Sequence, residues 1–250
     1  MKIAVAIKRA PVMDVRFQIA ASGTSIDETG LKYDISDFDG YAVEAALRLW
    51  EKDKQGEIVA ISLGPDVVQE TIRKALSMGV HRGVQLKAER IPFDGLAIAQ
   101  ALAAELEDGG FDLILFGRLA LDSSHGTVGA MTATLLGLPC VTSISRLEIA
   151  NGRANVRREL EGGAELLDVP LPCVLTIDEG IARPRLPTLP GIMAAKKKPL
   201  EVKPAQLGAE HLVVERMELP PERTGGRIIG EGPSAVPELV RLLQTEAKVL

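Results

Sequence analysis

The stretch "FDLILFGRLALDSSHGTVGAMTATLLGLP", residues 111–139, decides the predicted fold. Its apolar beginning, FDLILFG, is typical of a strand that is buried on both faces of a sheet. The strand leads through a loop of small hydroxyl residues and glycines into a helix. The loop has neither the lysine of a phosphate-transfer loop nor a Gly-x-Gly-x-x-Gly fingerprint. What such a loop holds is the functional question that this sequence raises.

The same alternation of strand and helix runs through the preceding part of the chain. Gly64 and Pro65 end the second strand, and we expect Asp66 to cap the helix that follows. Continuous apolar strands that alternate with helices predict an α/β fold with a mostly parallel, doubly wound sheet, whose ligands bind at the carboxyl ends of the strands. Strands are expected at 2–8, 57–64, 83–87 and 111–117, and helices near 39–54, 66–78 and 93–106.

The pattern changes after the quoted stretch, where short strands are separated by turn signals. Asn151-Gly152 is a strong hairpin signal, because both central residues of a type I′ turn need a positive φ. A second turn is expected at Gly162-Gly163. We predict an antiparallel hairpin insertion near residues 141–176, whose last strand, PCVLTID, returns to the main sheet.

The segment from about Ala182 onward is rich in proline and lysine and has no sustained periodicity, so we expect an ordered surface excursion or a linker. The chain is expected to end in a short amphipathic helix that packs either on its own domain or on a partner chain. We therefore divide the chain into an α/β domain at 1–183, a loop at 184–203 and a C-terminal extension at 204–250. The apolar face of the terminal helix would comprise Val236, Leu239, Val240 and Leu243.

Composition excludes several classes of protein. The 250 residues are 46% hydrophobic, enough for a large core, and the net charge of −5 argues against general binding to nucleic acid. Aromatic residues make up only 3%, so stacking platforms for single-stranded nucleic acid are not expected. No apolar run reaches the roughly 18 residues of a membrane-spanning helix, and no leader precedes the first strand. We expect a protein that is not membrane-embedded and is cytoplasmic, or in the mitochondrial matrix if a presequence has been removed.

The loop that follows Gly117 is a candidate phosphate site. A helix N-terminus exposes unpaired N–H groups and a partial positive charge, and small residues let a phosphate approach the backbone. Ser124, Thr127 and Gly129 lie around the start of this helix. The alternative is that Asp122, Ser123 and Ser124 only cap the helix, as such residues commonly do.

No catalytic or metal site is expected. His125 lies in the loop, but spacing ties no nucleophile or acid to it, and His81 and His211 form no ligand cluster with it or with the cysteines. Cys140 and Cys173 each follow a proline in an apolar context, which favours small buried side chains in a reducing compartment over a disulfide.

Three separated stretches together resemble the small (beta) subunit of electron transfer flavoproteins. They are VAIKRAP at 5–11 followed by SDFDGYAVEAALRLWE at 36–51, VAISLGPDVVQETIRKALSMGVHRG at 59–83, and RPRLPTLPGIMAAKKKPLEV, which ends at residue 202 and is the most specific. The resemblance implies an adenine-nucleotide-binding, Rossmann-like fold and an electron carrier without an enzymatic activity of its own. Such a subunit forms a heterodimer with a larger alpha subunit that holds most of the FAD, and it buries a structural AMP.

Carried over by position, the AMP pocket would lie at the carboxyl edge that the strand pattern indicates. The loop GRLALDSSHGTVGAMTA falls where the family has its nucleotide-binding loop, but the family's usual Asn-Gln-Thr-Gly and Asn-Pro-Phe are replaced here. The Val-Gly ending is similar to the electron-bifurcating branch, in which a second FAD takes the place of AMP. The cofactor-binding residues would be Ala6, Ser36, Asp37, Phe38, Asp39, Leu63, Gly117, Arg118, Leu119, Ala120, Leu121, Asp122, Ser123, Ser124, His125, Gly126, Thr127 and Val128.

The proline-lysine segment resembles the family's recognition loop, which docks onto acyl-CoA and related dehydrogenases, from which electrons pass to a membrane quinone oxidoreductase and the respiratory chain. Leu189 would be the apolar anchor, and the lysines would steer acidic partners. Composition alone favours instead a solvated charge run after a leucine that tucks into its own domain. The docking residues would be Leu189, Pro190, Ile192, Met193, Lys196, Lys197 and Lys198.

A nucleotide-binding enzyme or sensor on the same scaffold is the alternative from a different functional class. It would bind ATP with Mg²⁺ and turn it over. No paired carboxylates or lysine are placed in the loop to manage a triphosphate, which argues against it.

Overall fold

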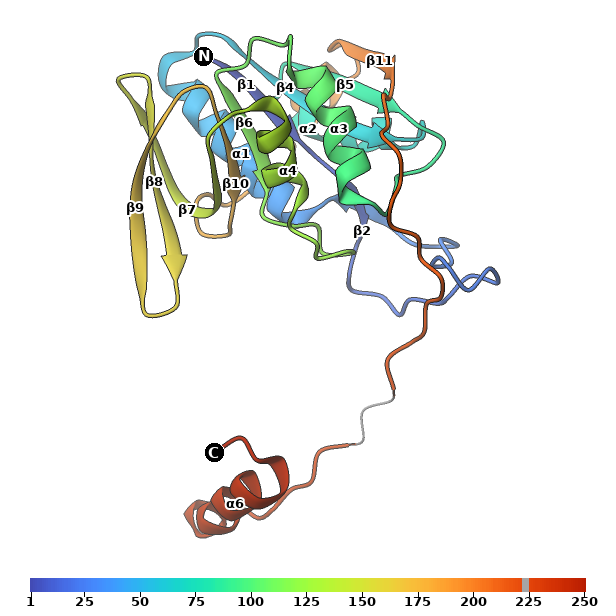
Figure 1. The fold of residues 1–250 in the computed structure, drawn as a ribbon, viewed down its shortest axis with the longest axis vertical. Coiled ribbons are helices and arrows are strands. Elements are labelled where there is room, and N and C mark those ends of the chain that lie inside the picture. Colours follow the sequence, from blue (N-terminus) through green and yellow to red (C-terminus); the bar gives the residue numbers. More distant parts are fainter. Residues whose placement is uncertain (222–224) are drawn as a thin grey trace.

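A computed structural model describes residues 1–221 and 225–250 of the chain (Figure 1). A nine-stranded sheet runs through the body in the order β11-β5-β4-β1-β6-β10-β7-β8-β9. Neighbouring strands are parallel from β11 to β7, whereas β7, β8 and β9 form an antiparallel arm at one end. The mostly parallel α/β sheet predicted from the sequence is confirmed.

Strands and helices alternate along the first half of the chain as predicted. Two three-residue strands, β2 (Arg9–Pro11) and β3 (Tyr33–Ile35), form a separate antiparallel pair that periodicity did not reveal, because such short strands show no pattern. The alternating elements are β1 (Lys2–Ala6), α1 (Asp37–Asp53), β4 (Glu57–Gly64), α2 (Val68–Met78), β5 (Arg82–Lys87), α3 (Gly95–Leu106), β6 (Leu113–Gly117) and α4 (Val128–Leu136).

The sheet is covered on both faces, because successive side chains of a strand point to opposite sides. Ile3 and Val5 of β1 belong to a core with α1 and α2, whereas Ala4 and Ala6 belong to a second core with α3 and α4. Both faces of β1, β4 and β6 are therefore buried from solvent. This burial explains why these strands read as continuous apolar runs.

The start of α2 differs from the prediction. Its N-cap position is Val67, and no side chain caps it. The Asp66 carboxylate instead accepts hydrogen bonds from Lys87 Nζ at 2.9 Å and Gln85 Nε2 at 3.4 Å. Both partners lie on β5, and the charged lysine offers a stronger hydrogen bond than a backbone N–H of the helix.

The antiparallel insertion lies where the turn signals place it. It comprises β7 (Cys140–Ala150), β8 (Arg153–Leu160) and β9 (Gly163–Pro170). Asn151 and Gly152, with φ values of 51° and 71°, form the predicted turn. The chain then returns as β10 (Cys173–Ile177), which lies between β6 and β7 and is parallel to both.

The proline-lysine segment has more regular structure than predicted. Helix α5 (Leu189–Ala195) begins with Thr188 as its N-cap, and β11 (Leu200–Pro204) pairs with β5 as an edge strand of the main sheet. A helix of seven residues is too short to show a helical period in the sequence. The prolines also counted against a helix, but Pro190 lies in its first turn, where proline is tolerated.

The predicted terminal helix is present as α6 (Val236–Leu242), preceded by the short turn η1 (Pro233–Ala235) and followed by η2 (Leu243–Ala247). Figure 1 shows it well apart from the sheet and its helices. Val236, Leu239 and Val240 of its apolar face are exposed. Packing on its own α/β domain was one of the two expected arrangements, and the helix does not adopt it.

Candidate functional site

A cleft opens at the carboxyl ends of β1, β4 and β6. Its volume is about 120 Å³. A cavity needs only about 10–15 Å³ to hold the centre of a water molecule. The cleft is therefore large enough for a ligand to enter. The position agrees with the rule that ligands of parallel sheets bind beyond the strand ends.

The walls of the cleft are mainly apolar, and a few polar groups stand at one end. The polar side chains are those of Lys8, Asp39, Arg118 and Thr127. Small-molecule sites in proteins commonly combine apolar walls with a few polar groups in this way. The apolar walls are formed by Ile61, Leu63, Ile91, Ile98, Leu102 and Phe116.

Asp39 joins three elements at the floor of the cleft. It lies in the first turn of α1, and its carboxylate accepts hydrogen bonds from the backbone N–H of Lys8 at 2.8 Å and of Gly117 at 3.0 Å. Burial raises the pKa of Asp39 to about 7, and the two backbone hydrogen bonds oppose this shift without cancelling it. The carboxyl group therefore titrates near neutral pH.

Gly117 allows β6 to approach α1 this closely. A Cβ at position 117 would lie 2.4 Å from Oδ1 of Asp39 and 2.6 Å from its backbone nitrogen. No side chain fits in that space. The glycine that ends the predicted strand is thus required by the contact between β6 and the start of α1.

Two cationic side chains border the polar end of the cleft. Lys8 Nζ donates to the Asp122 carboxylate at 2.7 Å and lies 3.5 Å from the Ser123 hydroxyl. Arg118 pairs with Asp178 at 2.9 Å, and its guanidinium lies 4.9 Å from the centre of the Phe38 ring. Asp122 and Asp178 thus hold both cations beside the cleft, where an anion could exchange for either carboxylate.

The start of α4 faces this polar end without a side-chain cap. Thr127 is the N-cap residue, and its hydroxyl makes no capping hydrogen bond. The N–H groups of Ser123 and Ser124 are turned to the carbonyl of Ala120, at 3.2 and 2.7 Å. The interpretation of Asp122, Ser123 and Ser124 as caps of this helix is therefore wrong, and the first N–H groups of α4 remain available to a ligand.

The cleft brings together only part of the predicted cofactor-binding set. The predicted residues that line it are Ala6, Asp39, Leu63, Gly117, Arg118, Leu119, Ala120, Gly126, Thr127 and Val128. The remaining ones do not line it, and Asp37 lines a separate hollow with Tyr41 and Pro184. They are Ser36, Asp37, Phe38, Leu121, Asp122, Ser123, Ser124 and His125. Among these, His125 packs edge-on against Phe93 with the ring centres 4.8 Å apart, as a surface pair.

Sequence reasoning missed several lining residues. Lys8 could have been found, since it follows β1 and thus lies at the carboxyl edge. Ile91, Ile98 and Leu102 come from the approach to α3 and from α3 itself, and their helical spacing indicates only packing on the sheet. The missed residues are Ile7, Lys8, Ile61, Ile91, Ile98, Leu102 and Phe116.

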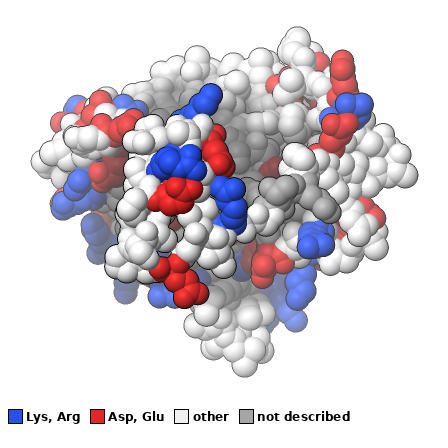
Figure 2. All heavy atoms as spheres, turned by 90° about the horizontal axis from the view of Figure 1, so that it is seen from below, with Lys and Arg blue, Asp and Glu red and all other residues white. Residues whose placement is uncertain are grey.

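Charge on this side of the molecule is mixed. Figure 2 shows basic and acidic side chains interspersed, with uncharged surface between them. Within residues 1–221 and 225–250, no three His, Cys, Asp or Glu side chains come close enough to hold a metal ion. In the same ranges no helix is both long enough and apolar enough to cross a bilayer.

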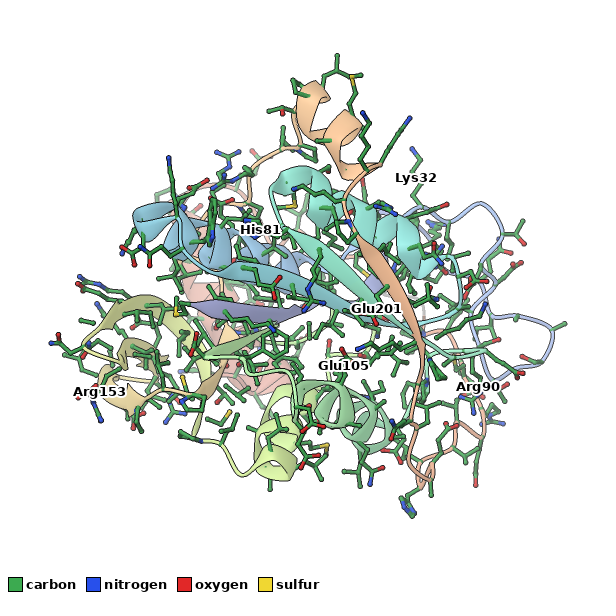
Figure 3. All side chains as sticks on the ribbon, turned by 90° about the horizontal axis from the view of Figure 1, so that it is seen from above. Lys32, His81, Arg90, Glu105, Arg153 and Glu201 are labelled. Carbon is green, nitrogen blue, oxygen red and sulfur yellow. The ribbon has the colours of Figure 1, made fainter. Side chains whose placement is uncertain are left out.

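The predicted docking residues lie on and after α5, which stands out from the body in Figure 3. Leu189 is 72% exposed and Met193 65% exposed, and Ile192 is also exposed. Lys196 and Lys197 are exposed, whereas Lys198 turns inward and donates to two backbone carbonyls. The run of three lysines is therefore not uniformly solvated, and its role in steering partners stays a prediction. Composition alone favoured a Leu189 side chain that packs into its own domain, and the structure does not have this arrangement.

Comparison with known proteins places this geometry in a family context. The family model described as "Electron transfer flavoprotein domain" matches residues 23–207. The chain is 37% identical over 261 aligned residues to electron transfer flavoprotein subunit beta of Bacillus subtilis, covering 100% of both chains. It is 39% identical to the human subunit beta, over 90% of this chain and 91% of the human one. The mitochondrial subunit beta of Arabidopsis thaliana is 35% identical over the full length of both.

Proposed function

The chain belongs to the electron transfer flavoprotein family as a small, beta, subunit, and from this premise we propose that it binds a structural AMP in the cleft and helps to hold FAD in a heterodimer with an alpha subunit. The observation that carries the AMP assignment is the cleft itself: apolar walls, two cations and an uncapped helix start meet at the carboxyl edge of the sheet.

The residues of the cleft fit a mononucleotide. Leu63, Ile98 and Phe116 offer an apolar surface to a base, and the N–H groups at the start of α4 would receive the phosphate together with Lys8. The hydroxyl of Ser36 is buried and has no hydrogen-bond partner within the described ranges, but Ser36 does not line the cleft. Thr127, which lines the cleft, contributes a hydroxyl. In this proposal the nucleotide acts as a structural element and is not turned over.

FAD supplies the redox chemistry of such a heterodimer. In this proposal the chain completes the surroundings of the flavin and presents α5 to acyl-CoA and related dehydrogenases. Electrons then pass from the heterodimer to a membrane quinone oxidoreductase. The exposed Leu189 and Met193 support this role, since an anchor must be accessible to be buried by a partner. The compartment would be the cytoplasm or the mitochondrial matrix, as the partners require.

A second candidate is the electron-bifurcating variant, in which the beta subunit holds a second FAD. The observation in its favour is the loop itself, which ends in Val128-Gly129 and has Gly126 with a φ of 62° in place of the family's usual amide side chains. The two candidates differ in the nucleotide content of the heterodimer.

The test is to co-express the chain with its alpha subunit, purify the heterodimer, denature it and quantify the released nucleotides by chromatography. One FAD and one AMP per heterodimer are expected. Two FAD and no AMP would assign the bifurcating variant. A colourless protein that binds no alpha subunit would contradict the whole proposal.

A further inference from the structure

Two long cationic side chains cross between α2 and the segment that carries α5. Arg73 of α2 donates through Nη1 to the carbonyls of Ala195 and Lys198, at 2.6 and 2.7 Å. Lys198 runs in the opposite direction, and its Nζ donates to the carbonyls of Leu76 and Val80 at 2.9 and 2.6 Å. Each cation thus binds carbonyls at the end of the other's element, where the helix dipole is negative.

Packing alone does little to fix α5. Ala195 is its one buried residue, and the apolar side chains of its outer face point away from the body. The close approach to α2 depends on Gly191, where a Cβ would lie 2.4 Å from the carbonyl oxygen of Ser77. A short helix with one buried side chain would pivot if only this contact held it. The four charge-assisted hydrogen bonds therefore determine its orientation.

Lys198 differs in this respect from the two lysines before it. Lys196 and Lys197 are exposed and have no ion pair or hydrogen-bonded acid within the described ranges, whereas Lys198 is partly buried. Burial lowers the pKa of Lys198. The run of three lysines thus divides into two charges that face solvent and one side chain that belongs to the framework.

We propose that Arg73 and Lys198 are positioning residues that hold α5 in the orientation in which Leu189 meets a dehydrogenase, an inference that rests on the proposed docking role of α5. A rigid anchor loses less conformational freedom on binding than a mobile one. The hydrogen bonds of Arg73 and Lys198, here called the brace, would therefore strengthen docking without touching the partner. It would leave the flavin and the nucleotide cleft unaffected, because neither residue lines that cleft.

The experiment measures reduction of the flavin-loaded heterodimer by one purified acyl-CoA dehydrogenase with its acyl-CoA substrate, with the heterodimer as the varied acceptor. Lys198→Met removes the donor of one side of the brace, and Arg73→Gln replaces the charged guanidinium of the other side with a shorter, neutral amide. We expect each to raise KM for the heterodimer about tenfold, the factor that corresponds to about 1.4 kcal/mol. The kcat, flavin content and assembly with the alpha subunit should not change. Lys198→Arg, which keeps a charged donor, should recover most of the loss.

Lys197→Met is the matched control, because it removes the same charge from the adjacent position. An effect that acts through charge steering is screened by salt. The rise in KM of Lys197→Met should therefore disappear at high ionic strength, whereas the rise in KM of Lys198→Met should persist. Salt-sensitive rises of equal size in both variants would overturn the brace. So would loss of flavin or heterodimer in Lys198→Met and Arg73→Gln, since that outcome shows a general structural role.

Leu189→Ala separates failure of the inference from failure of the proposed function. If this variant raises KM and the two brace variants do not, α5 docks the partner without the brace, and only the inference falls. If the unchanged heterodimer accepts no electrons, or Leu189→Ala leaves KM as it was, the docking role falls and the inference falls with it.

Discussion

The carboxylate of Asp39 accepts a hydrogen bond from the backbone N–H of Gly117 at 3.0 Å, and this contact ties the first turn of α1 to the end of β6. The second carboxylate oxygen accepts a hydrogen bond from the backbone N–H of Lys8, which lies just beyond β1. One buried side chain therefore fixes the spacing of two neighbouring strand ends. Because these strand ends form the floor of the cleft, the shape of the site depends on this acid and this glycine.

Gly117→Ala should lower the free energy of unfolding by about 1–3 kcal/mol, the usual cost of overpacking a tight site. The new Cβ would lie 2.4 Å from Oδ1 of Asp39. Chemical denaturation of the heterodimer at fixed protein concentration measures the change. Gly163→Ala, at the first position of β9 where a Cβ meets nothing within 4 Å, is the control and should stay within about 0.5 kcal/mol. Equal effects would show that β6 can move away from α1 at no cost.

Asp39 should make stability fall as pH rises from about 4 to about 7. Its pKa is raised from 3.8 to about 7 in the fold, so within that window the folded chain keeps a proton that the unfolded chain has lost. This contribution is greatest below pH 4, decreases by at most about 1.4 kcal/mol per pH unit, and is constant above pH 7.

Asp39→Asn provides the measurement, because an amide does not titrate. The difference in unfolding free energy between the unchanged protein and the variant should shrink with rising pH across the window. The variant should still be less stable at acid pH, since its amide must point an N–H donor at one of the two backbone N–H groups. A difference that stays flat from pH 4 to 8 would mean that Asp39 is already ionised at acid pH.

Arg185→Met should lower the free energy of unfolding by about 1.5–3 kcal/mol, the range for hydrogen bonds to charged groups. The Glu44 side chain is 4% exposed and accepts from Arg185 Nε at 2.8 Å. Without Arg185 the buried carboxylate keeps only Arg48 as a cationic partner, at 3.0 Å. Thermal or denaturant unfolding compares this variant with Arg183→Met. Arg183 is exposed and forms no ion pair among the described residues, so its removal should have little effect, and a similar loss at both positions would contradict the assignment.

Cys173 should resist alkylation in the folded protein. Burial raises the pKa of its thiol to about 12, so at pH 8 only about one part in ten thousand is the reactive thiolate. Mass spectrometry after a timed exposure to iodoacetamide should find Cys173 unmodified until denaturant is added. Rapid labelling of the native chain would show that β10 opens readily.

The sequence predicted the sheet better than it predicted the cleft. Buried parallel strands must be apolar throughout, so β1, β4 and β6 could be read directly, and Asn151-Gly152 marked the hairpin because its backbone requires positive φ. Strand order was not predictable in full. Nothing local in Leu200–Pro204 indicates that it pairs with β5, more than 110 residues earlier in the chain.

The cleft could be placed at the right edge but not fully listed. Gly117 and Thr127 follow from the strand, loop and helix pattern, whereas Ile91 and Leu102 line the cleft only because α3 packs beside α4. The hydrogen bonds by which Arg73 and Lys198 join α2 to the segment around α5 could not be predicted, for a similar reason. A run of three lysines looks uniform in sequence, and only the position of α2 distinguishes the third from the first two.

The sheet order also has a consequence for how the chain emerges from the ribosome. β5 has a partner on one side only until β11 is made, and β6 likewise has one partner until β10 is made. Two strands of the nascent polypeptide therefore have an unpaired edge until residues 204 and 177, respectively, have been synthesised. Truncation before Leu200 would therefore leave the edge of β5 unpaired. Unpaired strand edges are surfaces that chaperones bind and from which aggregation starts.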